Sequence, residues 1–347
     1  MKKFIAYMLA LVLLAGLVPC AGSAEAGTVN VVTTIFPIYD WVRQIAGESG
    51  RVAPVMLLDS GVDLHSFQPS AKDILTVSSA DLFVYVGGES DAWVENVLAA
   101  AVNPSLVSLS LTKAMGEDLK EEEIVEGMEH DHDHGHEEDE DHDHEDEDHD
   151  HEEEHEHDED HDHDHEEEEE YDEHVWLSLR NAVKLVNAIA GVLAAADPDG
   201  ADAYLANAAA YTAKLQALDA AYAETVNAAA HKTLLFGDRF PFRYMTDDYG
   251  LSYYAAFTGC SAESEASFET VAFLARKTDE LGLPAVMTIE GPNHRIAETV
   301  VATASDPARK ILTLNSMQSV TAEDVKQGAD YLSMMEENLK VLKEALN

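Results

Sequence analysis

The sequence predicts an α/β fold with two lobes, each built on a parallel sheet, and a long rigid helix that bridges them. β-Branched apolar runs alternate with amphipathic helical segments over residues 28–116, and the alternation returns over residues 231–347. Alternation of this kind favours parallel sheets that are covered by helices on both faces. Between the two runs, residues 198–230 form an alanine-rich segment of helical period. At about 1.5 Å per residue this helix would be roughly 45 Å long, which suits a connector between lobes.

The first lobe opens with a β-branched apolar run at residues 29–35, which predicts a buried strand. Pro37 follows, at the start of an amphipathic helix that extends through Ile45. Further strands are expected at 52–58, 82–86 and 106–109, with one helix capped by Ser70 and another at 93–101.

The helical period of residues 174–197 predicts a helix that returns to the first lobe. The second lobe then repeats the alternation of strands and helices. Its strands are expected at 233–236, 252–257, 285–289 and 310–314, and its helices at 242–249, 267–281, 294–304 and 321–346.

Residues 1–26 have the pattern of an export signal, because two lysines precede an apolar run and small residues follow it. The run is too short for a membrane span. Cys20 ends a partial lipoprotein box and is a candidate lipid anchor, although Pro19 disfavours it and ordinary cleavage near residues 24–26 is the alternative. The protein is therefore expected in the periplasm or on the outer face of the membrane. Cys260 is then a single thiol, and no disulfide framework is expected.

Residues 117–173 form a low-complexity segment between the two lobes. They carry 36 acidic side chains and one lysine, and so contribute −35 to the net charge of −47. With so few apolar side chains the segment cannot offset the entropy cost of folding, and it is predicted to be disordered. It contains 13 of the 17 histidines: His130, His132, His134, His136, His142, His144, His149, His151, His155, His157, His161, His163 and His165.

This composition predicts a metal-collecting loop. Neutral imidazole and carboxylate groups are ligands for Zn²⁺. A solvated acidic spacer is the alternative interpretation, but acidity alone would require no imidazole. The rest of the chain carries −12 and contains no basic patch or nucleic-acid motif, so nucleic acid is not an expected partner.

Five polar side chains stand where a binding site of this fold is expected. Ligands of open α/β sheets bind beyond the carboxyl ends of the strands, on the loops that lead into helices. A metal site built from loops of both lobes would use such positions. A single loop histidine is more often a surface or packing residue, and His231 and His294 are interpreted in that way. The five candidates are His65, His174, Asp238, Glu290 and Asn315.

Several blocks of the sequence resemble the zinc/manganese substrate-binding proteins of ABC importers. These are TTIFPIYDWVRQIAG, LHSFQPSAKDI, DEHVWLSLRNA and FPFRYMTDDYGL, in this order, with a His/acidic insert that is typical of the zinc-specific members. The resemblance covers nearly the whole mature chain. It implies two α/β lobes bridged by a rigid helix, a metal ion in the cleft between them, and a monomer that works with a membrane permease and its ATPase. It also implies His65 and His174 as the first two metal ligands.

The second half of the site departs from the family pattern. An ungapped match puts Arg239 on the third ligand position, and a guanidinium cannot coordinate a cation. A shift by one residue gives Asp238, which can. The fourth ligand is usually an aspartate, where this chain has Asn315, and Glu290 is a substitute from the neighbouring strand. Glu290 is equally well interpreted as a cap on the turn before the following helix.

The metal-binding residues and the resemblance together suggest capture and delivery of Zn²⁺, with Mn²⁺ as the alternative ion because an Asp/Asn pair suits harder cations. The insert would hand metal to the closed site from a high effective concentration. An enzyme is not expected, since no nucleophile elbow, HExxH pair or phosphate loop is present. Two alternatives remain at this point: a zinc hydrolase with Glu290 as base, and a metal-buffering or adhesive surface protein.

Overall fold

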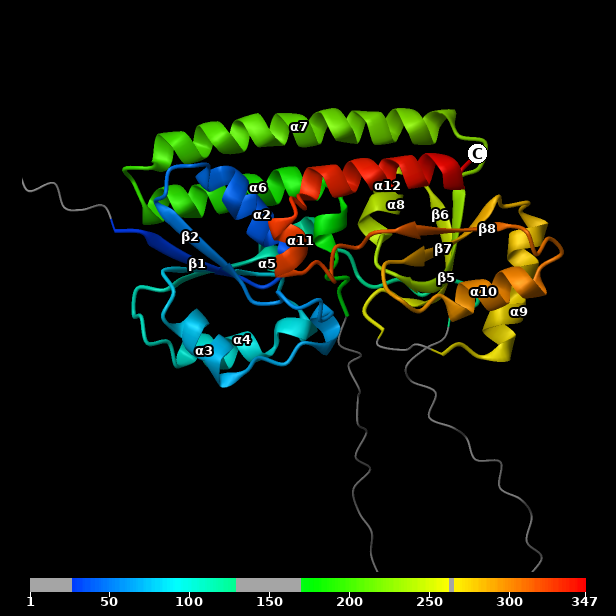
Figure 1. The fold of residues 1–347 in the computed structure, drawn as a ribbon, viewed down its shortest axis with the longest axis horizontal. Helices are drawn as coiled ribbons and strands as arrows, with labels where there is room; N and C mark the ends of the chain where they lie inside the picture. The colour runs from blue at the N-terminus through cyan, green and yellow to red at the C-terminus, as the bar shows by residue number, and fades with distance from the viewer. Residues whose placement is uncertain (1–26, 129–169, 262–264) are drawn as a thin grey trace, which may run out of the picture.

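The structure, a computed structural model, describes residues 27–128, 170–261 and 265–347. The expected export signal with Cys20 and the histidines from His130 to His165 lie outside these residues. The described chain forms two α/β lobes, each built on a four-stranded parallel sheet (Figure 1). This confirms the predicted fold class.

The first sheet has the strand order β2–β1–β3–β4. Val31 and Val32 of β1 and Phe83 and Val84 of β3 are at most 2% exposed, because helices cover both faces of the sheet. Helices α2 and α6 lie on one side of it, and α3 and α4 lie on the other (Figure 1). The elements are β1 (Val29–Thr33), α2 (Phe36–Ala46), β2 (Val52–Met56), α3 (Ala71–Ser78), β3 (Leu82–Tyr85), α4 (Trp93–Ala99), β4 (Val107–Ser110), α5 (Leu111–Met115) and α6 (Leu179–Ala196).

Local sequence signals account for the ends of these helices. Pro37 lies in the first turn of α2, where its missing N–H costs nothing, and Gly47 ends the helix at a φ of 59°. Ser70 caps α3 in a capping box with Asp73, as predicted. Helix α6 is long and apolar enough to cross a membrane, but its apolar side chains pack against α2 and α7.

The second sheet has the order β6–β5–β7–β8, which repeats the order of the first. Helices α9 and α10 cover its outer face around a separate apolar cluster. The elements are β5 (Thr233–Phe240), α8 (Arg243–Tyr249), β6 (Ser252–Thr258), α9 (Phe268–Glu280), β7 (Ala285–Ile289), α10 (Arg295–Thr303), β8 (Lys310–Leu314), α11 (Ala322–Lys326) and α12 (Tyr331–Ala345).

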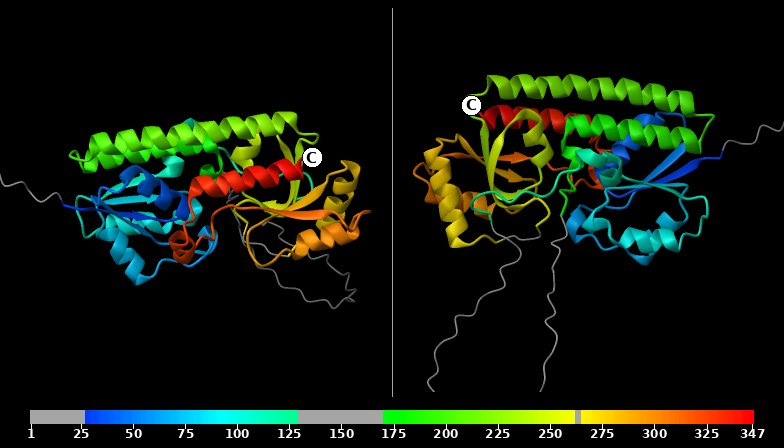
Figure 2. Two further views of the ribbon diagram at one scale, coloured as in Figure 1. Left: turned by 45° about the horizontal axis from the view of Figure 1, so that its top comes forward. Right: turned by 180° about the vertical axis from the view of Figure 1, so that it is seen from behind.

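Helix α7 (Ala201–Ala228) runs along both lobes. It packs on α2 and α6 in the first lobe and on α8 and α12 in the second, and the three views agree on this course (Figures 1 and 2). Tyr204, Leu215 and Tyr222 are fully buried along it. Through these helices a single apolar core extends from the first sheet into the second lobe.

Two predicted elements in the second lobe were wrong in extent. The expected helix at 321–346 is divided into α11 and α12, since Gly328 takes a φ of 100° and Asp330 caps a new helix. Strand β5 does not end at Phe236. It continues after a register shift, where Arg239 pairs with Phe257 and Phe240 with Thr258. Asp238 and Arg239 therefore lie within the strand and not in the loop after it.

The predicted disorder of residues 117–128 and 170–173 was also wrong. These two segments pair with each other: Glu122 N donates to Glu170 O at 2.8 Å, and Asp172 N donates to Lys120 O at 2.9 Å. Both contact the second lobe, where Lys120 forms an ion pair with Asp247 and the Tyr244 hydroxyl donates to Asp172 O at 2.8 Å. The acidic composition did not predict this order, because the order depends on backbone pairing and on ion pairs with the second lobe.

Candidate metal centre

His65 and His174 converge at the junction of the two lobes. His65 lies on a single 3₁₀ turn (Leu64–Ser66) in the loop between β2 and α3, and Asp63 caps that turn by accepting from His65 N at 3.0 Å. His174 immediately precedes a second 3₁₀ turn (Val175–Leu177) that leads into α6. Their Nε2 atoms are 3.1 Å apart, although the residues are 109 positions apart in the chain. Two nitrogens on one tetrahedral Zn²⁺ would be roughly 3.3 Å apart.

Hydrogen bonds at the opposite ring nitrogens orient both imidazoles. Nδ1 of His65 is 2.8 Å from Ser90 Oγ. Nδ1 of His174 is 3.0 Å from Asp172 Oδ1, and Asp172 also accepts from the His174 backbone N–H at 2.8 Å. When Nδ1 carries the proton, Nε2 presents a lone pair. Such outer partners fix the tautomer of metal-binding histidines, so both rings are arranged to offer Nε2 to one ion.

Burial also keeps His65 in the form that binds metal. Burial, joined by the repulsion of a proton on neighbouring His174, lowers the pKa of His65 to about 3. The imidazole is therefore neutral at physiological pH, and a neutral imidazole is the ligand form. Burial would raise the pKa of Asp63, but the hydrogen bond and charge of Arg239, together with His65, outweigh it and hold that pKa below its usual value.

A third donor comes from Cys260, which the sequence analysis left as an unassigned thiol. One ligand atom each from His65, His174 and Cys260 all lie within 4.8 Å of one another, and among the described residues this is the one such group of His, Cys, Asp and Glu side chains. Cys260 follows β6 by two residues. The rule that selected the other strand-end candidates would also have selected Cys260, had thiols been considered with them. Burial, and next the charge of Asp172, raises the pKa of the thiol above its usual value.

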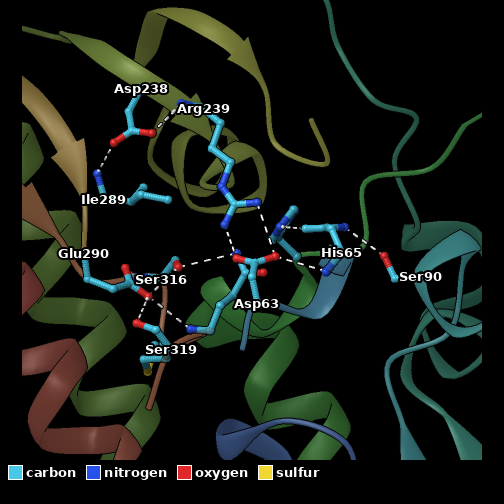
Figure 3. A network of polar contacts seen from close by, with 12 residues as sticks. Asp63, His65, Ser90, Asp238, Arg239, Ile289, Glu290, Ser316 and Ser319 are labelled. Atoms are coloured by element: carbon cyan, nitrogen blue, oxygen red, sulfur yellow. Dashed lines mark hydrogen bonds and ion pairs between the residues drawn. The ribbon is translucent and has the colours of Figure 1, made fainter. Parts of the chain in front are cut away.

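Asp238 is adjacent to this centre but does not belong to it. Its carboxylate accepts from the backbone N–H groups of Arg239 at 2.9 Å and Ile289 at 3.2 Å (Figure 3). It thereby ties β5 to β7. Arg239, which the ungapped match put on a ligand position, reaches across to the first lobe and forms an ion pair with Asp63 (Figure 3).

Glu290 and Asn315 organise the loop after β8. The Glu290 carboxylate accepts from Ser316 N at 2.6 Å, Ser316 Oγ at 2.8 Å, Gln318 N at 3.1 Å and Ser319 Oγ at 3.4 Å. The Asn315 side-chain oxygen accepts from Met317 N at 2.7 Å. Neither side chain is part of the group around His65. The sequence allowed Glu290 to be a cap on the turn before the following helix, α10. Its carboxylate is a cap, but on the loop 316–319.

A cavity of about 690 Å³ lies beside the His65–His174 pair. Its wall carries carboxylates from both the first lobe and the paired segments that flank the histidine-rich region. Such a lining attracts cations to a cavity that His65 itself borders. The lining includes His65, Asp91, Glu122, Glu170, Glu173 and Cys260.

The comparisons with known proteins agree with this architecture. Residues 31–345 match the model of the family described as zinc-uptake complex component A, periplasmic. The zinc-binding lipoprotein AdcA of Streptococcus pneumoniae is 34% identical over 345 residues, which cover 99% of this chain and 61% of AdcA. The chain therefore spans about three fifths of the length of that relative. The high-affinity zinc uptake system protein ZnuA of Bacillus subtilis is 30% identical over 94% of this chain and 90% of its own length.

A solved structure shows the same fold. The Zn(II)-bound ZnuA-like domain of Streptococcus pneumoniae AdcA superimposes with a TM-score of 0.66 at 29% identity, and the match covers 92% of this chain and 99% of that domain. Apart from the first two residues of β1, both sheets lie within residues 31–345, and so do the bridging helices and the loops that carry the two histidines. The chain thus belongs to the family of the periplasmic zinc-uptake complex component A.

Proposed function

We propose that this protein binds Zn²⁺ outside the cytoplasm and delivers it to the membrane permease of an ABC importer, which its ATPase drives. One observation carries the proposal: two imidazoles from distant loops, that of His174 fully buried and that of His65 only 6% exposed, present Nε2 atoms 3.1 Å apart at the junction of the lobes. Imidazole nitrogen favours Zn²⁺, whereas Mn²⁺ favours oxygen ligands, so Zn²⁺ is the proposed cargo. The family is a transport component, and Glu290, which caps a loop, does not serve as a hydrolytic base.

The histidine-rich segment is proposed to collect metal for this site. The two segments that flank it pair through an isolated bridge between Glu121 and Tyr171, and Glu170 and Tyr171 line the acidic cavity beside His65. Metal released at the base of the segment would enter a space lined by carboxylates. Removing residues 129–169 should leave tight zinc binding intact and reduce zinc uptake only when zinc is scarce.

Export, a lipid anchor at Cys20 and a monomeric state complete the proposal. Relatives in Streptococcus pneumoniae are named zinc-binding lipoproteins. A radiolabelled fatty acid incorporated into the wild-type chain, but not into Cys20→Ser, would establish the anchor. A membrane-free periplasmic form that retains Cys20 would exclude it.

The test of the central proposal is zinc binding by paired variants. We expect His65→Ala and His174→Ala each to lose the tight site in a competition titration against a chelator. His231→Ala, a histidine outside the site, should bind as the wild type does. Cells that depend on the importer should take up zinc poorly with either site variant. Wild-type affinity in both site variants would contradict the proposal.

A further inference from the structure

We infer that the thiolate of Cys260 is the second lobe's ligand for the zinc ion, which makes the centre a His₂Cys site. The inference rests on the proposed function, because it names a further ligand of the same cargo. His65 and His174 both belong to loops of the first lobe. An ion held by them alone would not join the lobes, whereas Cys260, which follows β6, brings a donor from the second lobe.

The backbone around Cys260 is held against His174. A Cβ atom added at Gly259 would lie 3.1 Å from the ring atoms Nδ1 and Cε1 of His174 and 2.8 Å from Phe240 O. Glycine therefore permits this close approach. On the other side, Cys260 N donates to Glu122 Oε1 at 3.0 Å. The position of the thiol is thus determined by the same paired segments that place His174.

No other second-lobe side chain that the sequence suggested is available for the ion. The carboxylates of Asp238 and Glu290 accept hydrogen bonds from backbone N–H groups within their own lobe. Arg239 carries a positive charge and pairs with Asp63. Among the described residues, Cys260 is the second-lobe donor that lies within 4.8 Å of both imidazoles.

The distances fit a site that tightens when the ion enters. With a Zn–S bond of about 2.3 Å and Zn–N bonds of about 2.0 Å, tetrahedral geometry puts sulfur and nitrogen roughly 3.5 Å apart. The present donors lie within 4.8 Å of one another, so a shift of about 1 Å would complete the coordination. A soft thiolate also discriminates against Mn²⁺, which prefers oxygen ligands.

The thiol provides a direct spectroscopic test. The chain contains only two cysteines, so Cys260 is the single thiol in a Cys20→Ser background. We expect Co²⁺ to give a thiolate-to-metal charge-transfer band in this background, and the band to vanish in Cys260→Ser. The histidine-rich segment cannot produce such a band, because it contains no sulfur. Stoichiometric Zn²⁺ should also protect the thiol from iodoacetamide in the unmutated site.

The outcomes separate this inference from the proposed function. We expect Cys260→Ser to weaken Zn²⁺ binding about tenfold or more, and to reduce the preference for Zn²⁺ over Mn²⁺. If there is no charge-transfer band and no thiol protection, but His65→Ala still loses tight zinc binding, then Cys260 is not a ligand. The proposed zinc delivery would remain valid in that case. Wild-type zinc binding in the His65, His174 and Cys260 variants alike would overturn both. The charge-transfer band and the protection assay are both measured with Cys260 intact. They therefore test whether Cys260 binds the metal even if Cys260→Ser misfolds.

Discussion

The carboxylate of Asp172 determines the orientation of the His174 ring. It is 1% exposed and receives both the ring Nδ1–H and the backbone N–H of His174. A neighbouring carboxylate, Glu173, is 2% exposed and lies 3.9 Å from Nδ1 of His65. Asp172 therefore supports the His174 ring directly, whereas Glu173 acts on His65 through Ser90, whose backbone N–H donates to Glu173 Oε1 at 3.0 Å and whose hydroxyl contacts the His65 ring.

We expect Asp172→Ala to weaken zinc binding by about 10- to 100-fold, because His174 then loses the partner that fixes its tautomer. Asp172→Asn keeps an acceptor oxygen, so it should lose less zinc affinity than Asp172→Ala does. A competition titration measures both, with Asp118→Ala, an exposed carboxylate paired with Lys184, as the control. Equal affinities in all four proteins would show that Asp172 does not orient the ligand.

Asp91 makes the stability of the metal-free protein depend on pH. Burial, opposed by the hydrogen bond from Gly87 N and reinforced by Glu173, raises the pKa of Asp91 to about 7. Between pH 4 and 7, roughly, the folded protein keeps a proton that the unfolded chain releases, so this group costs stability as the pH rises.

Asp91→Asn should therefore raise the free energy of unfolding at pH 8 by on the order of 1–3 kcal/mol. At pH 4 most of the gain should disappear, since Asp91 is then protonated in the folded wild-type chain and about half protonated in the unfolded one. The asparagine oxygen can still accept from Gly87 N, which donates to Asp91 at 2.9 Å. Denaturant unfolding of the zinc-free proteins at both pH values measures the difference. The same change at pH 4 and pH 8 would argue against an ionised Asp91.

Among the elements, α7 is the one that both lobes share. Its buried positions recur on the faces that meet α2 and α6 at one end and α8 and α12 at the other. Tyr222 donates from its hydroxyl to Met335 O at 2.6 Å, which ties α7 to α12. An alanine-rich helix suits this place because small side chains let neighbouring helices approach closely.

We expect Leu215→Ala in α7 to lower the free energy of unfolding by about 2–5 kcal/mol, because it leaves a cavity in the core. Leu215 is fully buried, whereas Leu205 on the same helix is 51% exposed. Leu205→Ala should change stability by less than about 0.5 kcal/mol. Denaturant titration of the two variants measures the contrast, and similar losses in both would mean that α7 is not packed as described.

At the scale of the whole molecule, the lobes are joined most firmly near α7 and more lightly near the metal centre. Close to the helices, Tyr331 N donates to Asp40 Oδ2 at 3.1 Å in buried surroundings. Near the centre, Arg239 and Asp63 form a partly exposed ion pair between the lobes. The buried joint should resist motion, and the ion pair is the contact that can open.

We expect Arg239→Ala to speed zinc release by roughly tenfold, because it removes a partly desolvated ion pair that holds the lobes together beside the ion. The release rate of Arg239→Lys should lie between those of the wild type and Arg239→Ala, since a lysine keeps the charge but cannot form the bidentate contact. Release into excess chelator, followed by stopped flow, gives the rates. Arg309→Ala, which breaks a pair with Asp279 inside the second lobe, is the control. An unchanged rate in Arg239→Ala would mean that the pair does not restrain opening.

The fold and the first half of the site could be predicted because both are local properties of the sequence. Alternating apolar runs indicated two parallel sheets, and the spacing of tyrosines and leucines indicated α7. His65 and His174 stood at ends of predicted elements, so their convergence followed from the rule for open sheets. The Ser70 cap was equally local.

The second half of the site was decided by tertiary structure. Whether Asp238, Glu290 or Asn315 can reach an ion depends on which backbone N–H groups already occupy their oxygens, and those donors lie up to 51 positions away. Arg239 finds its partner 176 positions away, in the other lobe. Local patterns determine helices and strands because their hydrogen bonds are local, but competition between a cation and distant hydrogen-bond donors is resolved only when the lobes pack together. That packing, and not any motif, brings the thiol of Cys260 to the two histidines.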